Sequence, residues 1–144
     1  MLRFEAAMLR LVNCRRASSA VEFAMVLPVF LTIVFGIVVF GSYLAVIHGV
    51  QQLAAEAARS SIAGMSETDR AARASSYVTA NAGTYPLINA SHLSVSAATS
   101  GSNANVFVVT VNYDASGMFI YTLPFVPRPP TQIARSAAIP YGGF

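Results

Sequence analysis

The chain has 144 residues, of which 55% are hydrophobic and only 10% are charged. This length allows one small domain with an appendage, and the composition is too apolar for an ordinary soluble domain. The formal net charge of +3 comes from the first 16 residues, where four arginines (Arg3, Arg10, Arg15, Arg16) outnumber one acid, Glu5. From residue 18 onward, five arginines balance five acids. The distribution therefore excludes a basic nucleic-acid-binding face on a folded domain.

An uncharged run, residues 23–47, follows the basic segment. As a helix it would span roughly 37 Å at ~1.5 Å per residue, enough to cross a ~30 Å hydrocarbon core with some tilt. The arginines before it predict a cytoplasmic N-terminus and an exported C-terminal part. The run is longer than the ~7–15 apolar residues of a secretory signal, so a single-pass anchor is favoured, with cleavage at its end as the alternative. The lone cysteine, Cys14, precedes the span, so no disulfide forms within the chain.

The pattern after the span is that of an amphipathic helix. Apolar residues recur at 3- and 4-residue spacing through 49–64: Val50, Leu53, Ala54, Ala57, Ala58 and Ile62. No turn signal separates this stretch from the span, so we expect one continuous helix from about residue 20 to 63, kinked near Pro28 and stopped by Gly64. Ser66 and Asp69 resemble a capping box for a second helix over 66–83.

The remaining chain indicates a small sheet. "HLSVSAAT" and "NVFVVTVNYD" alternate apolar and polar residues around the turn "SGSNA", which predicts a hairpin, and "IARSAAIPY" is a candidate third strand. Four prolines exclude a regular strand between 124 and 130. The predicted fold is α+β: a cytoplasmic leader (1–17), a long helix (18–63) that is half transmembrane and half amphipathic and periplasmic, and a periplasmic domain (64–144) with a short helix and an antiparallel sheet of two to four strands packed on the long helix.

Catalytic and metal-binding patterns are missing from the sequence. The two histidines, His48 and His92, are isolated from each other and from any cluster of Cys, Asp or Glu, and no glycine-rich phosphate loop follows a strand. We therefore expect no enzyme, no cofactor, no metal, no nucleic acid and no small-molecule substrate. A structural or interaction role is favoured over an anchored periplasmic enzyme.

Two motifs remain, "AVEFAMVLP" at 20–28 and "QQLAAEAAR" at 51–59, on either side of the apolar run. A carboxylate such as Glu22 at a membrane edge is a candidate functional residue. Together the motifs resemble the TadE-like proteins of the tight-adherence (Flp) pilus system, which belong to the type IV-like prepilins. The resemblance covers about 45 of the 144 residues.

The resemblance implies a minor pilin or pseudopilin in the inner membrane that a prepilin peptidase cuts between Ala17 and Ser18. The family's leader usually ends in glycine, and Ala17 adds one methyl group there. Glu22 would be the fifth mature residue and the charge that meets the new α-amine during assembly. Other pilus subunits and the inner-membrane assembly platform would be the partners, and the paralogous role of TadF stays open.

A second interface element is the spacing of Gly41, Ala45 and Gly49, which is typical of helices that approach closely in lipid. The alternative function is an uncleaved membrane-anchored envelope protein whose periplasmic domain binds another partner.

Overall fold

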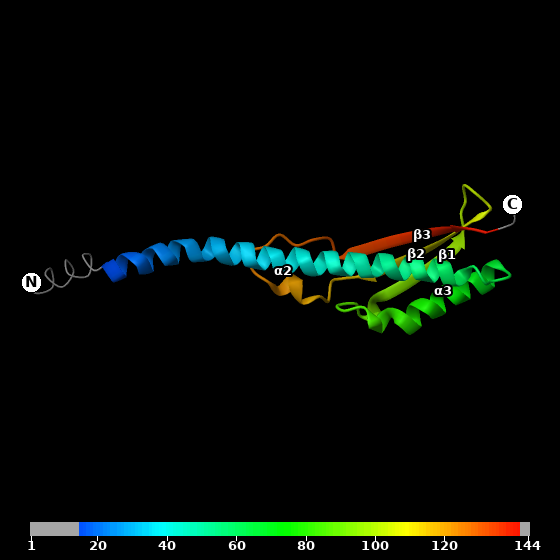
Figure 1. The fold of residues 1–144 in the computed structure, drawn as a ribbon, viewed down its shortest axis with the longest axis horizontal. Helices are drawn as coiled ribbons and strands as arrows, with labels where there is room; N and C mark the ends of the chain where they lie inside the picture. Colours follow the sequence, from blue (N-terminus) through cyan, green and yellow to red (C-terminus); the bar gives the residue numbers. More distant parts are fainter. Residues whose placement is uncertain (1–14, 142–144) are drawn as a thin grey trace, which may run out of the picture.

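The computed structural model describes residues 15–141, with side chains from residue 19 onward, so residues 1–14 of the expected leader (1–17) lie outside it. Figure 1 shows one long helix with a small domain alongside its C-terminal half. The elements in chain order are α2 (Arg15–Ser61), α3 (Glu67–Asn81), the short 3-10 helices η1 (Ala82–Thr84) and η2 (Ala90–His92), β1 (Leu93–Thr99), β2 (Val106–Asp114), the 3-10 helix η3 (Phe119–Thr122) and β3 (Gln132–Pro140). The predicted α+β fold is confirmed.

Helix α2 runs for 47 residues and includes Pro28 without interruption. The Thr32 hydroxyl donates to the Pro28 carbonyl oxygen at 2.8 Å. After Ser61 the chain turns back through Gly64, whose N–H donates to the Ser61 carbonyl oxygen at 3.0 Å. A single helix thus carries both sequence motifs.

Helix α3 starts where the capping pattern predicts. The Ser66 hydroxyl accepts the Asp69 N–H at 3.1 Å, which satisfies one of the free amides of the first turn. The Asp69 carboxylate reaches back to the Met65 N–H at 3.1 Å. Ala74 and Val78 face inward, so α3 lies on α2 in the domain core.

The three strands form an antiparallel sheet in the order β1-β2-β3. Alternate side chains of the central strand are buried, namely Phe107, Val109, Val111 and Tyr113. They pair across the sheet with positions of the same face, for example Val111 with Val95 and Tyr113 with Ile133. This face packs on the C-terminal half of α2, where Val50, Leu53 and Ala54 are fully buried, as the amphipathic pattern predicts. Ile62 departs from that pattern: it follows the end of α2 and is 55% exposed.

The domain begins to cover α2 inside the predicted span. Among the described side chains, Val39 is the first buried one, and Val46 is the next, about two helical turns later on the same face. Residues 19–38 are partly or fully exposed. The last third of the 23–47 run therefore has one face against protein.

The segment between β2 and β3, residues 115–131, forms the end of the domain nearer the uncovered helix (Figure 1). Met118 and Ile120 are buried in the shared core, and η3 contacts α2. The Tyr121 hydroxyl donates to the Pro130 carbonyl oxygen at 3.0 Å, which ties the two arms of the segment together. The prolines prevent a strand here, as the sequence predicts.

Candidate functional site

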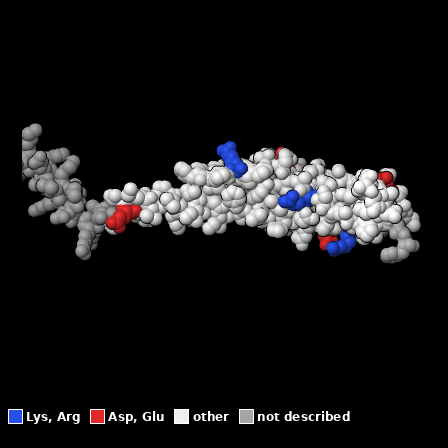
Figure 2. Space-filling model, turned by 90° about the horizontal axis from the view of Figure 1, so that it is seen from above, with Lys and Arg blue, Asp and Glu red and all other residues white. Residues whose placement is uncertain are grey.

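The proposed cleavage junction lies at the N-terminal end of α2. Ala17 and Ser18 are helical in the backbone, and their side chains are outside the described part. Glu22 is exposed. Figure 2 shows acidic atoms at this end of the helix, followed by a long stretch without charged atoms up to the domain. Within the described residues of α2, the next acid along the chain is Glu56. The carboxylate thus lies at the beginning of a long uncharged stretch of α2.

The helix places Ser18 and Glu22 one turn apart. Residues at i and i+4 share a helix face, and their axial separation is ~6 Å at ~1.5 Å per residue. An α-amine at Ser18 would therefore lie on the same face as the Glu22 carboxylate. The spacing permits a charge pair within one chain as well as one between neighbouring chains.

The distal motif, "QQLAAEAAR", has a separate structural role. Leu53, Ala54, Ala57 and Ala58 are fully buried. Small side chains here let α3 and the sheet approach α2 closely. Glu56 and Arg59 lie on the outer side, joined by a 2.9 Å ion pair with exposed side chains. Exposed pairs of this kind contribute little stability. The alanines, rather than the charges, fix the domain to the helix.

The three small residues of the predicted packing face have different surroundings. Gly41 and Ala45 are exposed, and a Cβ on Gly41 would meet nothing within 4 Å. Gly49 is buried beneath its own domain, where a Cβ would come within 2.8 Å of Ile88 Cδ1 and 3.4 Å of Tyr85 Cδ1. A partner helix therefore has access to Gly41 and Ala45, whereas Gly49 serves packing within the chain.

Other polar groups take structural positions. In residues 15–141 no group of three or more His, Cys, Asp or Glu side chains is placed to hold a metal ion. His48 is exposed, and His92 Nδ1, in η2, lies 3.1 Å from the Asp114 carbonyl oxygen at the end of β2. Neither histidine lies in a group of that kind.

Among the described residues, the pKa values of two carboxyl groups, Asp69 and Asp114, are lowered, and both groups cap backbone N–H groups. The Met65 N–H and then the Arg73 side chain lower the pKa of Asp69. The backbone N–H of Ser116 and then its side chain lower the pKa of Asp114. Both carboxylates accept hydrogen bonds at the start of a helix or turn, which favours the charged form.

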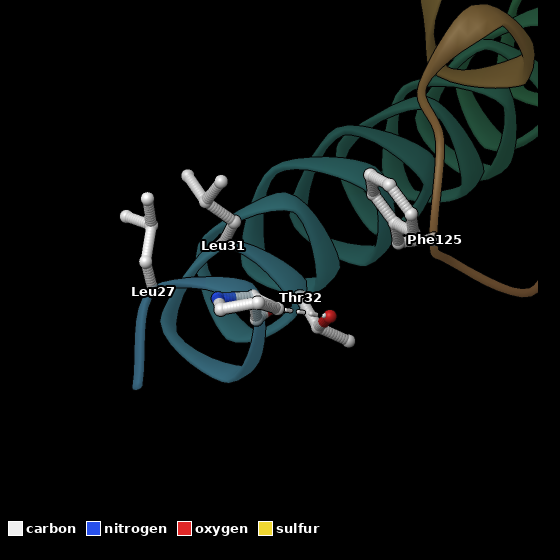
Figure 3. A pocket seen from close by; sticks show the side chains of 5 residues that line it. Leu27, Leu31, Thr32 and Phe125 are labelled. Carbon is white, nitrogen blue, oxygen red and sulfur yellow. Dashed lines mark hydrogen bonds between the residues drawn. The ribbon is translucent and has the colours of Figure 1, made fainter. Parts of the chain in front are cut away.

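Sequence reasoning missed the contact between segment 115–131 and α2. Phe125 lines an apolar pocket of about 180 Å³ with Leu27, Pro28, Leu31 and Thr32 (Figure 3). The exposed aromatic and proline content of the segment was the available signal, but nothing in it indicated which part of the helix it would reach.

The structure contains one helix, Ser19–Ser61 in its described part, that is long and apolar enough to cross a membrane. Only 6% of its most apolar 18-residue window is buried, which distinguishes it from the core helix of a globular domain. The family model described as "TadE-like protein" matches residues 17–59. Comparison with curated proteins and with solved structures finds no match.

Proposed function

From the TadE-like domain that this chain carries at residues 17–59, which associates it with the Tad pilus system, we propose that the protein is a minor pilin or pseudopilin in the biogenesis of Flp-type pili. It is anchored in the bacterial inner membrane by α2, with the N-terminus cytoplasmic and the domain periplasmic. A prepilin peptidase cuts the Ala17–Ser18 bond, and the mature chain acts with other Tad subunits and the assembly platform.

The observation that carries this proposal is the presence of both motifs on one unbroken helix. The match begins at Ala17 and ends at Arg59, so it includes the candidate junction, Glu22, the apolar run and the buried alanines. The two ends have complementary tasks: one offers a bond and a carboxylate to the assembly machinery, and the other holds the domain.

Glu22 acts as the assembly charge in this proposal. Cleavage releases an α-amine one helical turn from Glu22, and the two groups neutralise each other within or between chains as the helix joins a bundle. Opposite charges attract strongly at low dielectric, but their desolvation cancels much of the gain. The pair therefore sets the register of the helices more than it stabilises them.

The test is the N-terminus of the membrane protein with and without a co-expressed prepilin peptidase. The expected mature chain starts at Ser18 and lacks 17 residues. Ala17→Gly, which restores the usual family residue, keeps the cut, and Ala17→Leu blocks it because the peptidase accepts only a small residue there.

A chain that still starts at Met1 with an active peptidase, which processes a known prepilin in the same cells, contradicts the pilin proposal. That result favours the uncleaved bitopic envelope protein, since this alternative needs the same anchor and no cut.

A further inference from the structure

The uncovered part of α2 has the length of one bilayer core. Residues 19–38, which precede the first buried side chain at Val39, are 20 residues, or ~30 Å as a helix. The hydrocarbon core is also ~30 Å thick. If α2 spans the membrane, as the proposed function requires, the domain rests directly on the outer leaflet.

Segment 115–131 reaches below the level at which the domain begins. Phe125 shares its pocket with α2 residues of the uncovered stretch, of which Thr32 is nearest to the domain (Figure 3). Thr32 precedes Val39 by seven residues, or ~10 Å along the helix axis. This matches the ~5–10 Å to which interfacial elements insert below the headgroups.

The tip of this segment, residues 123–130, has a composition suited to a poorly hydrated environment. Four of the eight residues 123–130 are prolines, which have no backbone N–H to leave without a partner in lipid. Phe125 is 75% exposed and Phe119 is 48% exposed, so two aromatic rings are available at this end of the domain. Phe125 also has a left-handed backbone, with φ of 67°, a conformation that non-glycine residues adopt mainly where structure imposes it.

The charge of the segment fits an anionic bilayer surface. Arg128 is exposed, and its guanidinium is suited to phosphate oxygens at the end of a long apolar stem. The chain has no acid between residues 115 and 141. Nothing in the segment would repel a phospholipid headgroup.

We propose that the 123–130 tip is a membrane-interface element: Phe125 inserts into the outer leaflet beside α2, and Arg128 binds lipid phosphate above it. The occupant of this surface is phospholipid. The tip would hold the domain upright on the bilayer until the helix leaves the membrane.

Tryptophan fluorescence tests the inference, because the chain has no native tryptophan. Phe125→Trp is placed in the full chain, reconstituted in vesicles of phosphatidylethanolamine and phosphatidylglycerol with acyl chains brominated near the headgroup or near the methyl end. Two single-tryptophan controls accompany it. Phe30→Trp, at a side chain that is 57% exposed, reports the span itself. Met65→Trp, at a side chain that is 95% exposed beyond the far end of α2, reports water.

We expect blue-shifted emission from Trp at 125 that the brominated acyl chains quench, because its ring would lie ~10 Å below the level of Val39. Trp at 30 should be quenched most by the deeper bromines, and Trp at 65 should be unaffected. Quenching at 30 with water-like emission at 125 overturns the inference and leaves the span intact. Blue-shifted but unquenched emission at 125 also overturns it, because the ring would then lie against protein. No quenching at 30 refutes the span and the interface element together.

Discussion

Replacing Gly64 by alanine tests how tightly the turn joins the two helices. A Cβ at this buried position would lie 2.8 Å from the backbone N of Arg70 and 2.9 Å from its Cα, in addition to 2.6 Å from its Cγ. Ordinary carbon contacts are ~3.5–4.0 Å, so the first turn of α3 must move by roughly 0.6–1 Å. The neighbour is backbone and cannot rotate away. Overpacking of this kind costs ~1–3 kcal/mol.

A displacement of Arg70 would also affect contacts at the end of the sheet. The Arg70 guanidinium stacks 3.9 Å above the Tyr141 ring, and the Tyr141 hydroxyl pairs with Thr99 Oγ1 at 2.7 Å. A shift of Arg70 is therefore expected to weaken the contact between Thr99, the last residue of β1, and Tyr141, which follows β3. Gly83→Ala is the matched control, since its Cβ would meet nothing within 4 Å. Loss of glycine freedom in the unfolded chain should leave this control unchanged or more stable by ~0.4–1 kcal/mol.

The assay is thermal unfolding of the full chain in detergent, followed by the near-UV circular dichroism of its six tyrosines, all at position 43 or later. A change of 1 kcal/mol shifts the Tm of a domain of this size by roughly 4–8 °C. Gly64→Ala should lower Tm by about 4 °C or more, and Gly83→Ala should not lower it. Equal Tm values for the two variants would show that the close approach of residue 64 to the Arg70 backbone does not limit stability, and would refute this prediction.

Two further predictions concern charge. Glu22→Leu should leave α2 in the membrane fraction and abolish incorporation or pilus output, because it removes the proposed assembly charge. A strain with only this variant and normal pili contradicts the proposed role of Glu22. Asp69→Asn should lower Tm at pH 7. Because the folded pKa of Asp69 is lowered, its contribution is complete above the unfolded value of ~3.9 and disappears as pH falls through the folded pKa. The Tm difference from the natural chain should therefore narrow as pH falls below the unfolded value, and a constant difference would count against the capping carboxylate.

Local patterns in the sequence were sufficient for most of the fold. The Ser66 cap, the hairpin alternation and the 3- and 4-residue spacing from Val50 to Ala58 each reflect contacts close in sequence or the period of one element. The prediction that Ile62 lies on the apolar face of the helix was wrong, because the helix ends at Ser61, one residue before it. Helix ends are set by the turn that follows, which periodicity does not encode.

The boundary between the uncovered part of α2 and the part that the domain covers was not predictable. Val39 and Val38 are the same residue type, but one is buried beneath the domain and the other is 39% exposed. Lipid and protein core are both apolar, so the sequence of a span does not distinguish them. The boundary, like the burial of Gly49 under Ile88, depends on segments more than 35 residues away.

The continuity of α2 couples the orientation of its N-terminal turn to the orientation of the domain. Each residue of a helix adds about 100° of rotation, so the azimuth of Glu22 and that of the buried alanines at 54, 57 and 58 are locked together. In the proposed assembly, a partner that binds the N-terminal turn therefore also fixes the direction in which the sheet faces. One extra residue inserted in α2 would leave both of its ends intact and would rotate the domain by about 100° relative to the N-terminal turn.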